Sequence, residues 1–408
     1  MKPLVRRACA IAVAIVAVHA LDALIEKPGN RSAAVVAGLA VGVVLAGTAA
    51  VLVSLRARAT VRGAVALLIG TGAVIEGAGV TAAHLVRGSP TGADFTGIAS
   101  FLAGLVLLAI GGALLTGRLH RWWRLLAAPA AGVLLLYVVA PLVMAVIATH
   151  PPAKGVEART PADAGLAYRD VTAVAPDGVT LSGWYMPSRN GAAVVVVPGA
   201  WSTRSDALDQ AVVLARHGYG VLDLDPRGHG RSGGTAMDFG WYGQADVAAA
   251  LDFLGRQPDV DSARIGGLGL SMGAEELLTA AAGDSRLRAV VSEGGTNRTF
   301  DDVRPVAGDQ WLMVPAFWMI TTASDLISPA APPMALTDAV ESIAPRPVLL
   351  IAASEEPELT LTRHLHAAAP QTTQLWEPAN TAHTQGLATH PAQWSARVLG
   401  FLDAALLR

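Results

Sequence analysis

The stretch Gly269-Leu270-Ser271-Met272-Gly273 lies at a junction between two kinds of segment. Residues 264–268 form a short apolar run typical of a buried strand, and residues 274–282 have the pattern of a helix. A serine flanked by glycines at such a junction predicts a sharp turn that exposes the hydroxyl, because the glycines leave room for the close strand and helix. The first amides of the helix then favour negative charge beside the serine.

Strand and helix patterns alternate on both sides of this turn. Strands are predicted at 168–174, 179–186, 192–197, 221–225, 264–268, 289–292, 347–352 and 373–377, and helices at 205–216, 245–254, 274–282, 361–369 and 394–407. Such alternation predicts an α/β fold whose mostly parallel sheet is covered on both faces. Residues 299–343 break the rhythm and are rich in large apolar residues, so we expect a small helical cap that either packs ordinarily or walls an acyl-binding site.

The composition divides the chain at about residue 150. Residues 1–150 hold 12 Lys/Arg and 4 Asp/Glu, whereas residues 151–408 hold 18 and 28. The whole chain is 52% hydrophobic and 15% charged, against about 25% charged in ordinary soluble domains. This excludes a disordered chain, a coiled coil and a basic nucleic-acid binder, and the single Cys9 excludes an intramolecular disulfide. We expect a membrane domain (1–150), a linker (151–166) and an α/β domain (167–408).

Five apolar stretches before residue 150 are each close to the length that spans a bilayer, about 20 helical residues. They are 8–25, 33–55, 63–86, 95–115 and 125–147. The five segments that precede these stretches hold 3, 2, 3, 1 and 3 Lys/Arg residues in chain order. The first, third and fifth segments lie on the same side and hold nine of the twelve, and the positive-inside rule assigns this side to the cytoplasm. Five crossings then place residue 151 onward outside the cytoplasm. If the first stretch is instead a cleaved signal peptide, four helices remain and the α/β domain still faces outward.

Ionisable residues at membrane depth are costly and often functional. His19 and Asp22 lie toward the outer end of the first stretch, where water or snorkelling explains them. Glu76 is more central, and two interpretations stay open: a proton or ligand site, or a paired packing residue.

Three further segments accompany the serine turn. They are the apolar run 194–201 (VVVVPGAW), the loop 223–232 (DLDPRGHGRS) and the loop 381–384 (TAHT). Together with Gly-x-Ser-x-Gly they resemble the α/β-hydrolase superfamily, and most closely its serine-aminopeptidase-like and dienelactone-hydrolase-like branches. The resemblance extends from residue 168 to the end of the chain. Pro198 and Ala352-Ala353 depart from the family's pattern, which has His and His-Gly at these places.

The resemblance implies a catalytic triad in the chain order Ser, acid, His. Ser271 is the nucleophile, and the histidine is His383, which would take the serine proton and return it to the leaving group. The acid should follow the strand 347–352, where Glu356 falls on the family's position and Glu355 is the neighbouring alternative. This carboxylate would orient the imidazole.

The same resemblance implies an oxyanion hole of two backbone N–H groups, those of Met272 and Ala200. His390 is an alternative base, and His229 between two glycines has the position of a loop-structuring residue. His364 and His366 do not share a helix face, so they do not predict a metal site.

A second motif overlaps the serine turn. Gly267-Leu268-Gly269 with Gly273 and, further on, Glu293 is similar to a dinucleotide-binding fingerprint. Met272 stands where that fingerprint needs glycine, so we expect no cofactor. We also expect no metal ion, because the chain has one cysteine and His364 and His366 do not share a helix face.

These features predict a multi-pass membrane protein whose α/β domain is a serine hydrolase. It would cleave an ester, thioester or amide of a small-molecule or acyl/lipid-like substrate through an acyl-enzyme, with membrane lipid as its other partner and no nucleic acid. Two alternatives stay open: a membrane sensor or transporter whose domain only binds ligand, and acyl transfer to an acceptor other than water.

Overall fold

The computed structural model describes residues 140–306, 308 and 314–407, together with positions 61, 63–67, 69–71, 108, 111, 112 and 137. The chain divides into two units, Met1–Leu135 and Leu136–Arg408. In the first unit the described positions are helical. The second unit carries the sheet and its helices.

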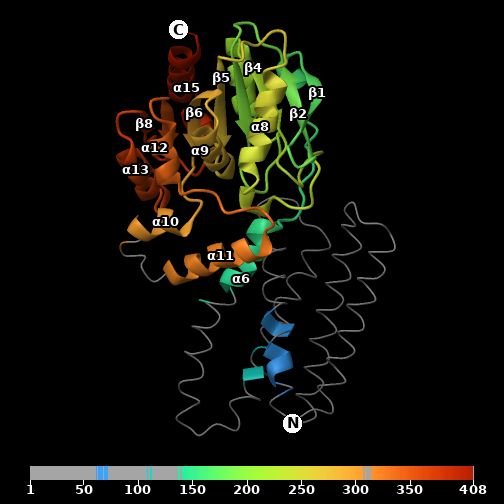
Figure 1. Ribbon diagram of the computed structural model, residues 1–408, viewed down its shortest axis with the longest axis vertical. Coiled ribbons are helices and arrows are strands. Elements are labelled where there is room, and N and C mark those ends of the chain that lie inside the picture. Colours follow the sequence, from blue (N-terminus) through green and yellow to red (C-terminus); the bar gives the residue numbers. More distant parts are fainter. Residues whose placement is uncertain are drawn as a thin grey trace, which may run out of the picture. The chain divides into compact units, whose positions relative to one another are not determined.

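An eight-stranded sheet organises the second unit (Figure 1). Its spatial order is β1-β2-β4-β3-β5-β6-β7-β8. The strands are β1 (Arg169–Val174), β2 (Thr180–Met186), β3 (Ala193–Val197), β4 (Gly220–Leu224), β5 (Ile265–Leu270), β6 (Leu287–Glu293), β7 (Val348–Ile351) and β8 (Thr373–Trp376). The β1–β2 and β2–β4 pairs are antiparallel and the others are parallel. All eight predicted strands are confirmed, each end within two residues of its expected place.

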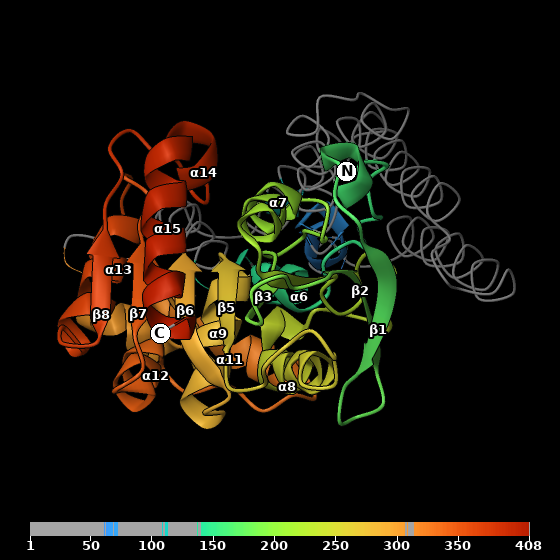
Figure 2. The same ribbon diagram turned by 90° about the horizontal axis from the view of Figure 1, so that it is seen from above.

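Helices cover both faces of this sheet (Figure 2). They are α7 (Leu208–His217), α8 (Gly243–Leu254), α9 (Met272–Gly283), α12 (Leu336–Ile343), α13 (Glu358–Ala368) and α15 (Pro391–Leu406). Apolar side chains of α8, α9, α12 and α13 form one core with the sheet, and those of α7 and α15 form the core on the opposite face. Because β3 and β5 are buried along their whole length, their apolar runs do not alternate. The chain therefore has the α/β-hydrolase fold with a mixed, mostly parallel sheet.

The segment expected to form the cap is divided between two environments. It contains α10 (Phe300–Val303), a short 3-10 turn (Arg304–Val306), α11 (Val314–Ile327) and α12. Helix α12 packs against α9, and its Leu336 and Val340 are fully buried, so it belongs to the layer of helices on the sheet. Helix α11 instead packs against α6 (Ala140–Thr149). Trp311 and Met313 of the expected cap lie outside the described residues.

The expected linker lies against the domain instead of running free. It contains a 3-10 turn, Pro161–Ala164, which is capped by Thr160. The backbone N–H and the hydroxyl of Thr160 both donate to the Asp163 carboxylate. Lys154 Nζ lies 2.5 Å from Asp206 Oδ1, and Arg159 Nη2 lies 2.6 Å from Asp209 Oδ1. This segment is therefore held to the edge of the domain beside α7.

The predicted membrane stretches 8–25 and 33–55 lie outside the described residues, as do most of the other three and the residues Glu76, His19 and Asp22. The last stretch, 125–147, overlaps α6. Among the helices that the structure describes, none combines the length and the apolar character needed to cross a bilayer.

Close packing at the turn after β5 generates a stability prediction. An alanine Cβ at position 273 would lie 2.5 Å from the carbonyl oxygen of Pro198 and closer still to that of Val197, whereas Gly400 on α15 has open space around it. We expect Gly273→Ala to lower the free energy of unfolding by about 1–3 kcal/mol, since overpacking displaces backbone. Gly400→Ala should instead raise it by up to about 1 kcal/mol, because alanine favours helix. Denaturant unfolding of both variants measures this, and equal stabilities would contradict the packing.

Candidate active site

Ser271 sits at the sharp turn between β5 and α9, as the sequence predicts. Its backbone has φ 53° and ψ −122°, a conformation that is strained for a residue with a side chain. The Ser271 N–H donates to the carbonyl of Glu293 on the neighbouring strand β6 at 2.8 Å, and the Ser271 carbonyl accepts from Ala274 N at 2.9 Å. The turn is thus held on both sides, and the hydroxyl is kept at the end of the strand.

Two glycines let neighbouring segments come close to the serine and the histidine. At Gly199, in the loop after β3, a Cβ would lie 3.0 Å from Ser271 Cβ. At Gly294, directly after β6, φ is +75° and a Cβ would lie 2.8 Å from His383 Cε1. Glycine at position 199 therefore lets the loop of Ala200 approach Ser271, and glycine at position 294 lets the His383 ring approach the end of β6.

Two loops at the carboxyl ends of β7 and β8 bring His383 to an acid. Ser354, in the first loop, donates its N–H to Thr381 O at 2.9 Å, and its Oγ accepts from Thr381 N at 2.7 Å. His383 Nδ1 lies 2.6 Å from Glu358 Oε2 and donates its hydrogen to this carboxylate. The other oxygen, Oε1, accepts from Ala353 N at 2.6 Å. Both carboxylate oxygens are thus occupied, which fixes the carboxylate and the imidazole.

The expected pairing of His383 with Glu356, or with Glu355, is wrong: the partner is Glu358. The Glu356 carboxylate accepts from Thr360 N at 3.2 Å and faces solvent, and Glu355 is exposed. Glu356 was expected because it falls on the acid position of the family's His-Gly-x-x-Asp pattern, and the next helix was predicted at 361–369. Helix α13 begins three residues earlier, and its first residue is Glu358. An acidic residue at a helix start, after the strand β7, is the sequence signal that points to Glu358.

The pKa of His383 is raised, and the hydrogen bond to Glu358 is the main cause, opposed by the burial of the ring. The carboxylates of Glu275 and Glu293 add smaller contributions in the same direction. This surrounding negative charge stabilises the imidazolium. Because Nδ1 is bonded to Glu358, the second ring nitrogen, Nε2, is the one that can exchange a proton.

A cavity of about 490 Å³ contains the reactive groups. Ser271, His383 and Ala200 line it together, so the structure brings three of the predicted site residues to one place. The volume lies in the range of small-molecule sites, about 300–1,000 Å³. One part of the wall is apolar, with Leu270 and Leu387, and another carries Asp206 and Asp209. The two aspartates are those that pair with Lys154 and Arg159.

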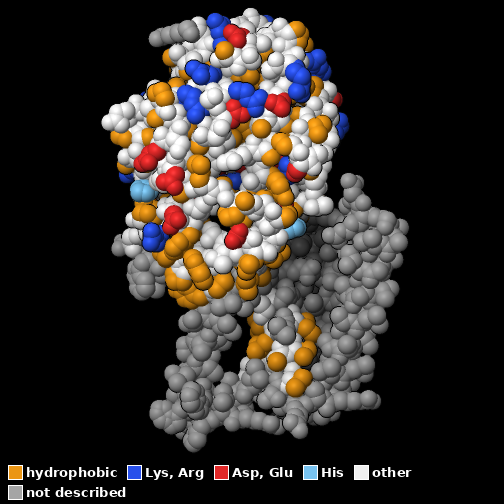
Figure 3. Space-filling view, in the orientation of Figure 1, with side chains coloured by type: hydrophobic (Ala, Val, Ile, Leu, Met, Phe, Trp, Pro, Cys, Tyr) orange, Lys and Arg blue, Asp and Glu red, His pale blue; other side chains and the backbone are white. Residues whose placement is uncertain are grey.

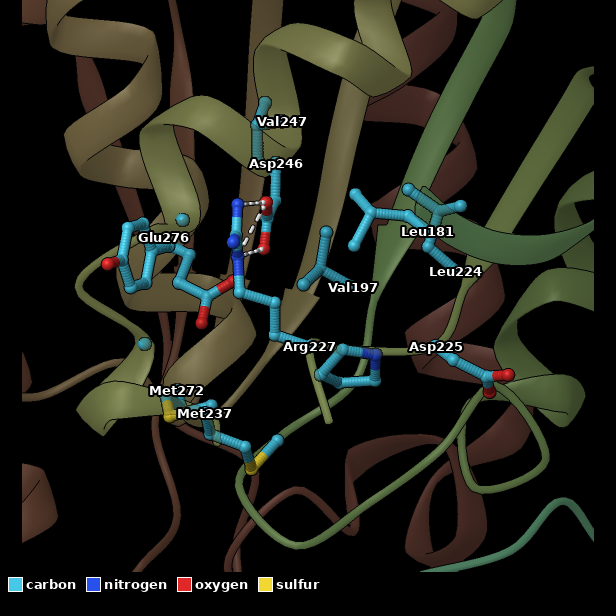
Figure 4. A pocket seen from close by; sticks show the side chains of 14 residues that line it. Leu181, Val197, Leu224, Asp225, Arg227, Met237, Asp246, Val247, Met272 and Glu276 are labelled. Carbon is cyan, nitrogen blue, oxygen red and sulfur yellow. Dashed lines mark hydrogen bonds and ion pairs between the residues drawn. The ribbon is translucent and has the colours of Figure 1, made fainter. Parts of the chain in front are cut away.

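Met272 also lies where the sequence predicts, as the first residue of α9. An amide at this position has no acceptor within its own helix. Its side chain lines a second, much smaller cavity of about 20 Å³, which has room for about one water molecule (Figure 4). Here burial raises the pKa of Glu276 to about 8 and that of Asp246 to about 6.

The loop 223–232 has a structural role. Arg227 bonds Asp246 and Asp177, each at 2.6 Å, and lies over the ring of Tyr242 (Figure 4 shows the bonds to Asp246). His229 is buried with Nδ1 3.3 Å from Arg227 O, and burial lowers its pKa. His229 is therefore a packing residue of this loop, as expected.

The remaining histidines of interest are bound elsewhere. His390 Nε2 donates to Ala379 O at 2.8 Å, and His366 Nδ1 lies 2.7 Å from Thr373 Oγ1. Neither these two residues nor His364 lines the cavity of Ser271. Glu293, which the dinucleotide interpretation needed at a ribose, is buried and bonds Gly386 and Trp394.

Comparison with known proteins finds a family model and several relatives. The model of the X-Pro dipeptidyl-peptidase (S15 family) matches residues 156–399. The chain is 38% identical over 136 residues to polyketide transferase ATR5 of Stachybotrys chlorohalonatus, covering 32% of this chain and 46% of that protein. It is 34% identical over 120 residues to a thiohydrolase of Eupenicillium brefeldianum, covering 28% and 39%. The chain thus spans less than half of the length of these curated relatives.

A solved structure supports the fold. The esterase Pf2001 of Pyrococcus furiosus superposes with a TM-score of 0.53 at 24% identity, covering 63% of this chain and 98% of that chain. The family model itself covers more than half of the chain and includes Ser271, Glu358 and His383. The chain therefore belongs to the X-Pro dipeptidyl-peptidase (S15) family and is a serine hydrolase.

Proposed function

We propose that this hydrolase cleaves an ester or thioester through a triad of Ser271, His383 and Glu358. The observation that carries the proposal is the 2.6 Å bond between His383 Nδ1 and Glu358, on a histidine that lines one cavity with Ser271. The names of two relatives, a thiohydrolase and a polyketide transferase, favour thioester or ester acyl groups, whereas the family is named for a peptidase, which cleaves amides.

In the proposed reaction, Ser271 Oγ attacks the acyl carbon while His383 Nε2 takes the hydroxyl proton. The backbone N–H groups of Met272 and Ala200 stabilise the oxyanion. His383 then gives its proton to the leaving group, and the acyl-enzyme remains. Water attacks this ester with His383 again as the base, which releases the acid and restores Ser271. Glu358 orients the imidazole and stabilises its charged form.

Acyl transfer is a second candidate, because one relative is a polyketide transferase. The same acyl-enzyme would then be attacked by an alcohol, amine or thiol in place of water. Product analysis with and without such an acceptor separates the two reactions.

We further propose that the chain is a multi-pass membrane protein whose hydrolase domain lies outside the cytoplasm and meets membrane lipid. The alternation of basic residues supports this orientation. Exposed large apolar side chains gather on α6 and α11, which also supports a nearby lipid phase. They are Leu142, Met144 and Val146 on α6, and Trp318, Leu326 and Ile327 on α11. Figure 3 shows apolar side chains along the edge of the domain where Figure 1 has α11.

The first prediction of the proposed function concerns the nucleophile and the base. We expect Ser271→Ala and His383→Ala each to lower kcat by about 10⁶, and the double variant to be little worse, because both changes remove the same step. The measurement is kcat/KM on an activated ester and on a thioester. His390→Ala is the matched control and should keep its activity, since it bonds Ala379 outside the cavity. Full activity of Ser271→Ala would overturn the proposed function.

The second prediction concerns the acid. Glu358→Gln should lower kcat by about 10⁴, the loss seen when a triad loses its orienting carboxylate. Glu356→Gln and Glu355→Gln make the same chemical change two and three residues away, and both should retain kcat. A larger loss in either control than in Glu358→Gln would contradict the triad.

The third prediction concerns topology. A reporter that works only in the cytoplasm should be silent when fused after Arg408 and active when fused after Arg62, which the alternation places inside. Activity of both fusions would contradict the proposed orientation.

A further inference from the structure

Glu293, the last residue of β6, lies between the nucleophile and the base without being part of the triad. Its neighbours in the sheet are Leu270, directly before Ser271, and Ile351 on β7. Glu293 is 2% exposed. A buried carboxylate needs hydrogen-bond donors, because it has lost its hydration.

The main chain of Glu293 holds the serine. Its carbonyl accepts from Ser271 N at 2.8 Å, which anchors the strained residue of the turn. The next residue, Gly294, passes directly beside the ring of His383. The backbone at the end of β6 thus contacts both members of the reacting pair.

The side chain of Glu293 holds the histidine loop. Oε1 accepts from Gly386 N, and Oε2 accepts from Trp394 Nε1, each at 2.8 Å. Gly386 begins α14 (Gly386–Thr389), three residues after His383, and Trp394 is fully buried on α15. An alanine Cβ at position 386 would lie 2.7 Å from Oε1, so the loop sits directly on the carboxylate.

We propose that Glu293 is a positioning residue, which fixes the His383 loop relative to Ser271 and contributes negative charge to the surroundings of the imidazole. This inference rests on the proposed hydrolase function. Three carboxylates act on His383 from three elements: Glu358 from α13, Glu275 from α9 and Glu293 from β6. Glu358 bonds His383 itself, and Glu275 N donates to Ser271 O at 3.2 Å. Glu293 bonds both the backbone of the nucleophile and the loop that carries the histidine.

The decisive variant is Glu293→Gln. A glutamine has one oxygen, which can still accept from Gly386 N, but its NH₂ group then faces Trp394 Nε1–H, and two donors cannot bond each other. We expect kcat to fall by up to about 10²-fold through displacement of the His383 loop, while KM changes little. Burial raises the pKa of Glu293 itself. Where Glu293 is ionised, its replacement by glutamine removes a negative charge and disfavours the imidazolium, so the pKa of His383 falls. The acid limb of the kcat/KM profile should therefore move to lower pH.

The double variant Glu293→Gln, Trp394→Phe separates charge from packing, because phenylalanine removes the clashing donor. It should recover part of kcat yet keep the shifted acid limb. Glu293→Asp keeps the charge but shortens the side chain, so it should lose kcat with the acid limb near its wild-type position. Glu377→Gln, at an exposed ion pair with Arg363, is the matched control and should leave both quantities unchanged.

The full-length chain is used throughout, with thermal unfolding measured for every variant and Ser271 reactivity followed with a fluorophosphonate. A wild-type acid limb in the double variant, or wild-type kcat in Glu293→Gln, would overturn the inference alone. A wild-type chain that does not react with the fluorophosphonate would overturn the proposed function, and this inference with it.

Discussion

The turn at Ser271 requires the backbone to pass from a buried strand into a buried helix through a conformation that side chains disfavour. Its φ of 53° is held by the bond to Glu293 O and by the first turn of α9. Strain of this kind costs on the order of 1–3 kcal/mol and persists only where the surroundings over-determine it. Here the surroundings are glycines: a Cβ at Gly199 or Gly273 would meet backbone or Ser271 itself. The conformation of Ser271 therefore depends on the lack of side chains at Gly199 and Gly273.

Much of the fold follows from local patterns in the sequence. The run of valines at β3 and the apolar run of β5 read as buried strands because parallel strands are apolar on both faces. The serine turn could be placed because its glycines stand between a strand pattern and a helix pattern. Ser271, His383 and Ala200 were accordingly found at one cavity. Helix α12 was missed inside the apolar segment, since its role became visible only through its packing on α9.

The acid illustrates what a sequence pattern cannot specify. Three glutamates, Glu355, Glu356 and Glu358, follow one strand, and their distance along the chain does not say which reaches the histidine. That choice depends on where α13 begins and on the clamp between Ser354 and Thr381, which joins two loops 27 residues apart. The family's spacing pointed to Glu356 in the loop, whereas the acid that bonds the histidine is the first residue of α13. Tertiary hydrogen bonds of this kind leave no periodic trace in the sequence.

Lys154 and Arg159, in the segment that precedes the sheet, bond two aspartates in the wall of the reactive cavity. Such partly exposed pairs are weakened by salt, because mobile ions screen charges over about 8 Å at physiological ionic strength. The segment therefore supplies positive charge that partly neutralises the two aspartates in the cavity wall. The charge met by an incoming substrate depends on ionic strength and on the integrity of a peptide stretch more than 100 residues before the nucleophile.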